Sequence, residues 1–217
     1  MAKLLITGLS NSGKTSLLKT LENALVVSRD GKPFPLELPH FNVLEFTGMS
    51  DLLEILSQKI ETYKAKIGDY PSTIVFDSVS RIFNDVEILC DSKFNGFETW
   101  NQINKHIQLL LDAISDLEAE KYNIVLIAHC TWDEKAGKYI ETCKGRFAKI
   151  GGFLSTCDYA INIEVKGSKR RVNLKGHSLS RTLINDMSDT MDADEFNLQK
   201  YLNRINEVNK NVSKWTI

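Results

Sequence analysis

The chain has 217 residues, of which 42% are hydrophobic and 25% charged, and its formal net charge is −1. These values are typical of a folded globular protein and exclude long disorder and a globally basic nucleic-acid-binding protein. No apolar run approaches the ~20 residues that a membrane-spanning helix needs, and the first residues lack the pattern of a signal peptide. The four cysteines are widely spaced in the sequence, which favours reduced thiols. We therefore expect a cytoplasmic protein without a membrane partner.

The first third of the chain alternates strand and helix patterns. Residues 3–7 form a short apolar run that ends at a glycine, which predicts a buried strand. Residues 16–22 follow with leucines at helical intervals, and residues 24–28 are a second apolar run. Residues 41–46 alternate as a strand does, and residues 51–67 have the spacing of a helix.

Two uninterrupted β-branched runs, residues 73–77 and 123–129, are the strongest strand candidates. A helix is expected between them, at about residues 99–120. Strands that alternate with helices at this spacing imply right-handed crossovers. The sequence therefore predicts an α/β fold with a mainly parallel sheet covered on both faces by helices.

The pattern changes near the C-terminus. Residues 160–165 and 171–174 are separated only by a short polar segment, which predicts a late antiparallel hairpin. Residues 194–208 have the spacing of a closing amphipathic helix. We expect one domain over the whole chain, with a core at about residues 1–165 and a hairpin and helix at about residues 166–217.

A phosphate-binding loop follows the first predicted strand. Residues 8–15 read GLSNSGKT and match the pattern G-x-x-x-x-G-K-[ST] between a predicted strand and a predicted helix. The loop backbone would surround the β-phosphate of ATP, Lys14 would bridge the β- and γ-phosphates, and Thr15 would hold Mg²⁺. The expected nucleotide-binding residues are Gly8, Asn11, Ser12, Gly13, Lys14, Thr15 and Ser16.

Acidic residues at strand ends are the candidates for metal binding and water activation. Asp77 ends an apolar run, as a Walker B aspartate does, although the same position also suits the start of a helix capped at Ser78. Asp30 and Glu45 are candidates for the catalytic base. Asp30 could instead only form a turn, and Glu45 could be an ordinary outward-facing strand residue.

His129 closes the predicted strand at residues 123–129, which places it beside Asp77 if the two strands are adjacent. A polar side chain there could contact the γ-phosphate and respond to its loss. A histidine in this position could equally be structural.

With these motifs placed, residues 1–165 resemble the RecA-like ATPases, in particular small phage nucleotide-binding proteins of single-strand annealing and recombination. In that family an aspartate followed by serine closes the Walker B strand, as Asp77 and Ser78 do. The resemblance also implies an acidic residue after the second strand that polarises water. Asp30 occupies that place, where a glutamate is usual.

The resemblance further implies loops that bind single-stranded DNA and subunits that complete each other's ATP site. In that family these loops follow the Walker B strand and the next strand, so the second loop would be residues 132–152 here. Its Lys144, Arg146 and Lys149 would contact DNA phosphates, although a solvated loop without this function is the alternative. Lys175 or Arg181 would act on a neighbouring subunit of a homo-oligomer, unless both are ordinary surface charges.

The leading prediction is Mg²⁺-dependent ATP hydrolysis coupled to single-stranded DNA binding in phage-type recombination or replication. A P-loop small-molecule kinase and a nucleotide-gated interaction protein with little turnover are the alternatives. A kinase would need an arginine-rich lid, and the only adjacent arginine pair, Arg170 and Arg171, lies in the predicted hairpin.

Overall fold

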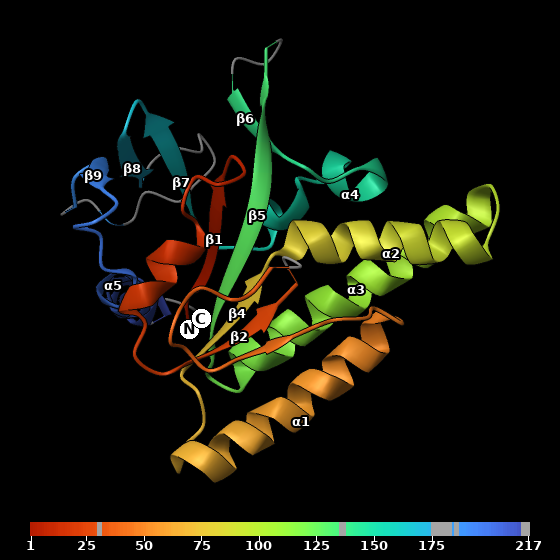
Figure 1. Ribbon diagram of the computed structural model, residues 1–217, viewed down its shortest axis with the longest axis horizontal. Helices are drawn as coiled ribbons and strands as arrows, with labels where there is room; N and C mark the ends of the chain where they lie inside the picture. The colour runs from red at the N-terminus through yellow and green to blue at the C-terminus, as the bar shows by residue number, and fades with distance from the viewer. Residues whose placement is uncertain (30–31, 135–137, 175–183, 185–186, 214–217) are drawn as a thin grey trace.

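A computed structural model describes residues 1–29, 32–134, 138–174, 184 and 187–213. Its described strands form one sheet in the order β3-β2-β4-β5-β1-β7-β8-β9, with β6 paired to β5 (Figure 1). The strands are β1 (Lys3–Gly8), β2 (Ala24–Ser28), β3 (His40–Asn42), β4 (Thr73–Asp77), β5 (Asn123–Asp133), β6 (Lys138–Glu141), β7 (Tyr159–Lys166), β8 (Lys169–Asn173) and β9 (Thr190–Asp192).

The strands from β3 through β7 along the sheet order pair in parallel, and antiparallel pairing occurs at the β5–β6 pair, at the β7–β8 hairpin and at β9. The predicted α/β fold is therefore confirmed: a mainly parallel sheet flanked by helices, with a late antiparallel hairpin. Strand β5 lies between β1 and β4, and its register pairs Gly8 with His129 and Asp77 with Ile127. The carboxyl ends of these strands consequently meet at one edge of the sheet.

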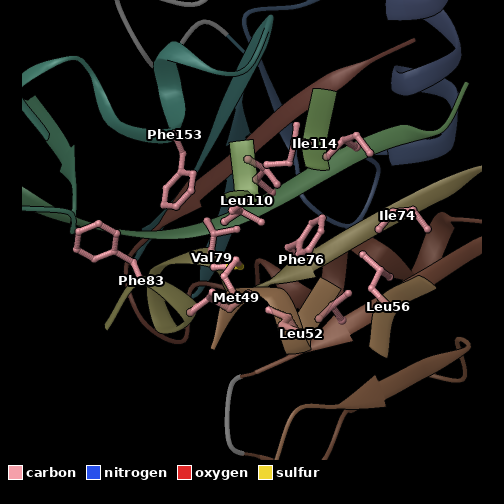
Figure 2. Packing of buried hydrophobic residues seen from close by; sticks show 14 of the residues in the cluster. Met49, Leu52, Leu56, Ile74, Phe76, Val79, Phe83, Leu110, Ile114 and Phe153 are labelled. Atoms are coloured by element: carbon pink, nitrogen blue, oxygen red, sulfur yellow. The ribbon is translucent and has the colours of Figure 1, made fainter. Parts of the chain in front are cut away.

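Helices cover both faces because the side chains of each strand point alternately to opposite sides. Leu5, Phe76 and Leu126 belong to a core shared with α1 (Met49–Ile67), α2 (Val79–Lys93) and α3 (Phe97–Ala119), part of which Figure 2 shows. Their strand neighbours, among them Ile6 and Val75, pack on the other side with the 3-10 helix η1 (Thr15–Thr20) and with α5 (Leu198–Ser213). Among the described residues, no helix is long and apolar enough to cross a bilayer.

Two predicted elements differ from the structure, and one helix was not predicted. The helix expected at residues 16–22 is a six-residue 3-10 helix, η1. The strand expected at residues 41–46 ends at Asn42, and beyond it the carbonyls of Val43 and Leu44 accept hydrogen bonds from the guanidinium of Arg29. Helix α2 was not predicted, although Ile82, Phe83 and Val86 lie at helical intervals and are buried.

Residues 132–152 also differ from the predicted loop. Strand β5 continues to Asp133 and forms a hairpin with β6, and the short helices α4 (Gly145–Lys149) and η2 (Gly152–Ser155) follow. The ring of Phe147 is buried and packs between Phe83 and Phe153, with ring centroids 6.0 Å and 4.9 Å away. Phe147 is therefore part of the core and cannot stack on a base.

Candidate nucleotide-binding site

The phosphate loop leaves the end of β1 and leads directly into η1. A Cβ atom on Gly8 would lie 2.5 Å from Ser12 Oγ and 3.0 Å from the carbonyl oxygen of Ile163, so only glycine fits there. Asn11 and Gly13 have φ angles of 62° and 96°, which give the loop its tight turn. The predicted binding residues are thus held in one compact loop, at the edge of the sheet where the parallel strands end.

Ser12 shows that this loop contains unused hydrogen-bonding capacity. Its hydroxyl oxygen is buried and has no hydrogen-bond partner among the described residues. An unpaired buried hydroxyl is unfavourable and needs an explanation. A bound phosphate would supply the missing acceptor, so the loop fits the group that its sequence predicts.

Lys14 folds back over the loop instead of pointing into solvent. Its ammonium donates hydrogen bonds to the carbonyls of Gly8 and Leu9 at 3.0 Å and 2.8 Å, and it lies 3.3 Å from Nδ1 of His129. An ammonium can only donate, so this contact makes Nδ1 the acceptor and leaves the ring proton on Nε2. The structure therefore brings His129 to the phosphate-loop lysine, although β5 does not end there as predicted.

Thr15 and Asp77 come together across the sheet edge. The Thr15 hydroxyl donates a hydrogen bond of 2.7 Å to Oδ2 of Asp77, whose side chain is buried. A hydroxyl and a carboxylate are the oxygen donors that Mg²⁺ uses beside water and phosphate. Within the described part of the chain, no group of three or more histidine, cysteine or acidic residues could hold a metal by itself.

The segment after Asp77 also begins a helix, which is the second role that its sequence allowed. The Asp77–Ser78 peptide is cis, and the Ser78 hydroxyl accepts a hydrogen bond from the backbone N–H of Arg81. Ser78 is thus the N-cap of α2. The metal-binding and helix-capping interpretations of this turn are compatible.

The end of β2 is fixed beside Asp77. The backbone N–H of Arg29 donates to the carbonyl of Asp77 at 2.6 Å, and its guanidinium forms an ion pair of 2.7 Å with the buried carboxylate of Asp85. Asp30, the candidate base, comes next in the chain and lies outside the described residues. Glu45 is exposed and lies outside any strand, which corrects its predicted place within one.

The basic residues predicted to bind DNA lie in helix α4 or at its N-cap, and not in the phosphate loop. Lys144 forms an exposed ion pair of 3.1 Å with Glu87, and Arg146 and Lys149 are exposed. Lys175 and Arg181, the predicted trans-acting residues, lie outside the described part of the chain.

Sequence reasoning missed Glu141, a residue that connects the β5–β6 hairpin to η2. Its carboxylate accepts hydrogen bonds from the backbone N–H groups of Phe153 and Leu154 at 2.8 Å and 2.7 Å. Burial nevertheless raises the pKa of Glu141 to about 7, because desolvation outweighs the two donors. An acidic residue in a polar segment gives no sequence signal for this role.

A phosphate loop at the end of a parallel sheet, with its threonine on a buried aspartate, defines an AAA-type P-loop nucleotide-binding protein. The chain belongs to the AAA domain family, whose sequence profile matches residues 1–193. Among solved structures, a KaiC-like protein, PH0186, from the hyperthermophilic archaeon Pyrococcus horikoshii OT3 has 13% sequence identity and a TM-score of 0.49. The similarity covers 83% of this chain and 81% of that one. No curated protein matches the sequence.

Proposed function

We propose that the protein binds ATP with Mg²⁺ and hydrolyses it. The observation that carries this proposal is the 2.7 Å contact between the Thr15 hydroxyl and Asp77, beside the ammonium of Lys14. This arrangement combines two oxygen ligands for a hard cation with a positive charge on a phosphate loop. We propose that the bound nucleotide contains adenine and not another base.

In this proposal, each residue of the site has a distinct task. The backbone N–H groups of the loop bind the β-phosphate, and Lys14 releases the carbonyls of Gly8 and Leu9 to reach the β- and γ-phosphates. Thr15 and Asp77 would hold Mg²⁺, and the ion would supply positive charge to the transferring phosphoryl group. Asp30 or Glu45 would orient the attacking water, while His129, in contact with Lys14, would respond to loss of the γ-phosphate.

We further propose that hydrolysis is coupled to single-stranded DNA in recombination or replication. Lys144, Arg146 and Lys149 gather within a few residues at α4, and cations at such spacing can contact successive phosphates. The buried Phe147 removes one stacking ring from this surface, so the proposed contact is mainly electrostatic. Arg146 lines a surface pocket together with residues of α3 that include the polar Asn101 and Gln108 and the acidic Glu98.

Steady-state turnover tests the coupled function. Phosphate release from ATP is measured with Mg²⁺, with the metal chelated, and with added single-stranded or duplex DNA of equal length. The proposal predicts metal-dependent release that single-stranded DNA stimulates more than duplex DNA does. Release that is absent under all conditions would contradict the ATPase, and release indifferent to both DNA forms would contradict the coupling.

Assembly is also proposed, with Lys175 or Arg181 acting on the phosphate site of a neighbouring copy. A cation delivered to the transition state can raise the rate by about 10³-fold or more. Subunits with Lys14→Ala still carry both basic residues, so mixing them with subunits lacking both should restore turnover. Mixed oligomers that remain inactive would rule out this donation in trans.

A further inference from the structure

The β7–β8 hairpin carries an arginine onto the phosphate loop of its own chain. A Cβ atom added to Gly13 would lie 3.2 Å from Cδ, 3.4 Å from Nε and 3.7 Å from Cζ of Arg170. These are contact distances to the guanidinium end of the side chain. Arg170 therefore covers the glycine that precedes Lys14.

Strand register explains how a residue so far along the chain reaches this loop. Strand β7 pairs in parallel with β1, and Ile163 lies opposite Gly8, where the loop begins. Strand β8 returns antiparallel, with Arg170 opposite Val165. Since Val165 is two residues beyond Ile163, the hairpin extends past the end of β1 and holds Arg170 over the loop.

Arg170 differs from the next residue along the strand in how its charge is compensated. Within the described part of the chain, no carboxylate forms an ion pair with its guanidinium, and the side chain is exposed. Arg171, the next residue along the strand, instead lies 3.7 Å from Asp192 on β9. The two adjacent arginines thus differ: one is paired within the sheet, and the other lies over a loop built for an anion.

We propose that Arg170 binds the phosphates of the nucleotide in cis, in the same protomer as Lys14. The proposal rests on the ATP site proposed above. A guanidinium is planar, always charged at physiological pH and suited to bidentate contact with phosphate oxygens. Its place beside Gly13 brings it to the loop residues whose backbone N–H groups face the anion. The β7–β8 hairpin is therefore part of the nucleotide site.

Calorimetric titration with MgATP and MgADP tests this role. Wild type is compared with Arg170→Ala, Arg170→Gln and the matched neighbour variant Arg171→Ala, after thermal unfolding has shown which variants are folded. We expect both Arg170 variants to bind the nucleotides at least tenfold more weakly and Arg171→Ala to stay within about twofold of wild type. Arg170→Lys should recover part of the affinity, because it restores a charge without the planar fork.

The outcomes separate this inference from the function on which it rests. Wild-type protein that binds no ATP would overturn the nucleotide site itself and the inference with it. Wild-type protein that binds ATP, with folded Arg170→Ala binding equally well, would overturn the role of Arg170 alone.

Mixing distinguishes action in cis from action in trans. Subunits with Arg170→Ala and an intact Lys14 are mixed with Lys14→Ala subunits that carry Arg170. Action in cis predicts that turnover is not restored, because no subunit then contains both residues. Restored turnover in mixed oligomers would overturn the cis assignment.

Discussion

At the residue scale, the contact between Thr15 and Asp77 predicts that the carboxylate of Asp77 makes ATP turnover depend on Mg²⁺. Asp77→Asn keeps the shape of the side chain, and its amide can still contact the Thr15 hydroxyl, but it removes the charge that we propose holds the metal. We expect Mg²⁺-dependent turnover to fall by about 100-fold or more. Nucleotide affinity measured without metal should change little. An unchanged dependence of turnover on Mg²⁺ concentration would contradict the assignment.

The buried carboxyl of Glu141 predicts a pH-dependent stability. Its pKa is raised from 4.5 to about 7 in the folded protein, so the folded state binds more protons than the unfolded state between those values. The contribution of Glu141 to the free energy of unfolding is therefore fully present below pH 4.5 and is lost as the pH rises through 7. Each unit of pKa difference corresponds to about 1.4 kcal/mol.

Glu141→Gln isolates this effect because glutamine does not titrate. Urea unfolding of both proteins at pH values from about 5 to 8 should show a decline in wild-type stability that is shallower in the variant. The variant should also be less stable at low pH, since its amide group can accept only one of the two backbone N–H bonds. Parallel stability curves would show that the carboxyl is not responsible.

At the element scale, α5 closes the sheet face that supports the phosphate loop. Leu202 is fully buried, and α5 joins η1 through the backbone N–H of Leu198, which donates to the Thr20 hydroxyl at 2.8 Å. Leu202→Ala should lower the free energy of unfolding by about 2–5 kcal/mol. Asn203→Ala, at the exposed neighbouring position, should change it by less than about 0.5 kcal/mol. Equal losses in the two variants would contradict this packing.

Helix α4 carries the proposed DNA contact. Replacing Lys144, Arg146 and Lys149 together by alanine should weaken single-stranded DNA binding and flatten its salt dependence, by roughly 0.7 in logarithmic slope for each phosphate that is no longer neutralised. The charge-matched control replaces the exposed lysines of α1, Lys59, Lys64 and Lys66. Fluorescence anisotropy over a range of salt concentrations measures both quantities. Equal affinity and slope in the two triple variants would place the DNA contact elsewhere.

Local sequence patterns predicted some elements well and could not predict others. Strand β4 has the predicted bounds, because an apolar β-branched run is closed by Asp77 at a sheet edge. The extension of β5 beyond His129 was missed, since residues 130–133 do not continue the uninterrupted apolar run and are held by pairing with β6. The place of Arg170 depends on pairing between β1 and β7, which are distant in sequence, so no local pattern reveals it.

At the scale of the whole molecule, strand order determines which residues can act together. Because β5 separates β1 from β4, the phosphate loop and Asp77 approach from two sides of His129. The β7–β8 hairpin adds Arg170 from the other side of β1. Residues from four distant parts of the chain therefore surround a single place at the sheet edge.

Hydrolysis at the phosphate loop is tested by ATP turnover in Lys14→Ala, measured beside wild type and Lys19→Ala. Lys19 lies in η1, only a short distance along the chain, but its side chain is half exposed and pairs with an exposed aspartate, Asp194. We expect Lys14→Ala to remain folded and to lose nearly all metal-dependent hydrolysis, while Lys19→Ala retains it. Wild-type turnover in a folded Lys14→Ala protein would contradict hydrolysis at this phosphate loop.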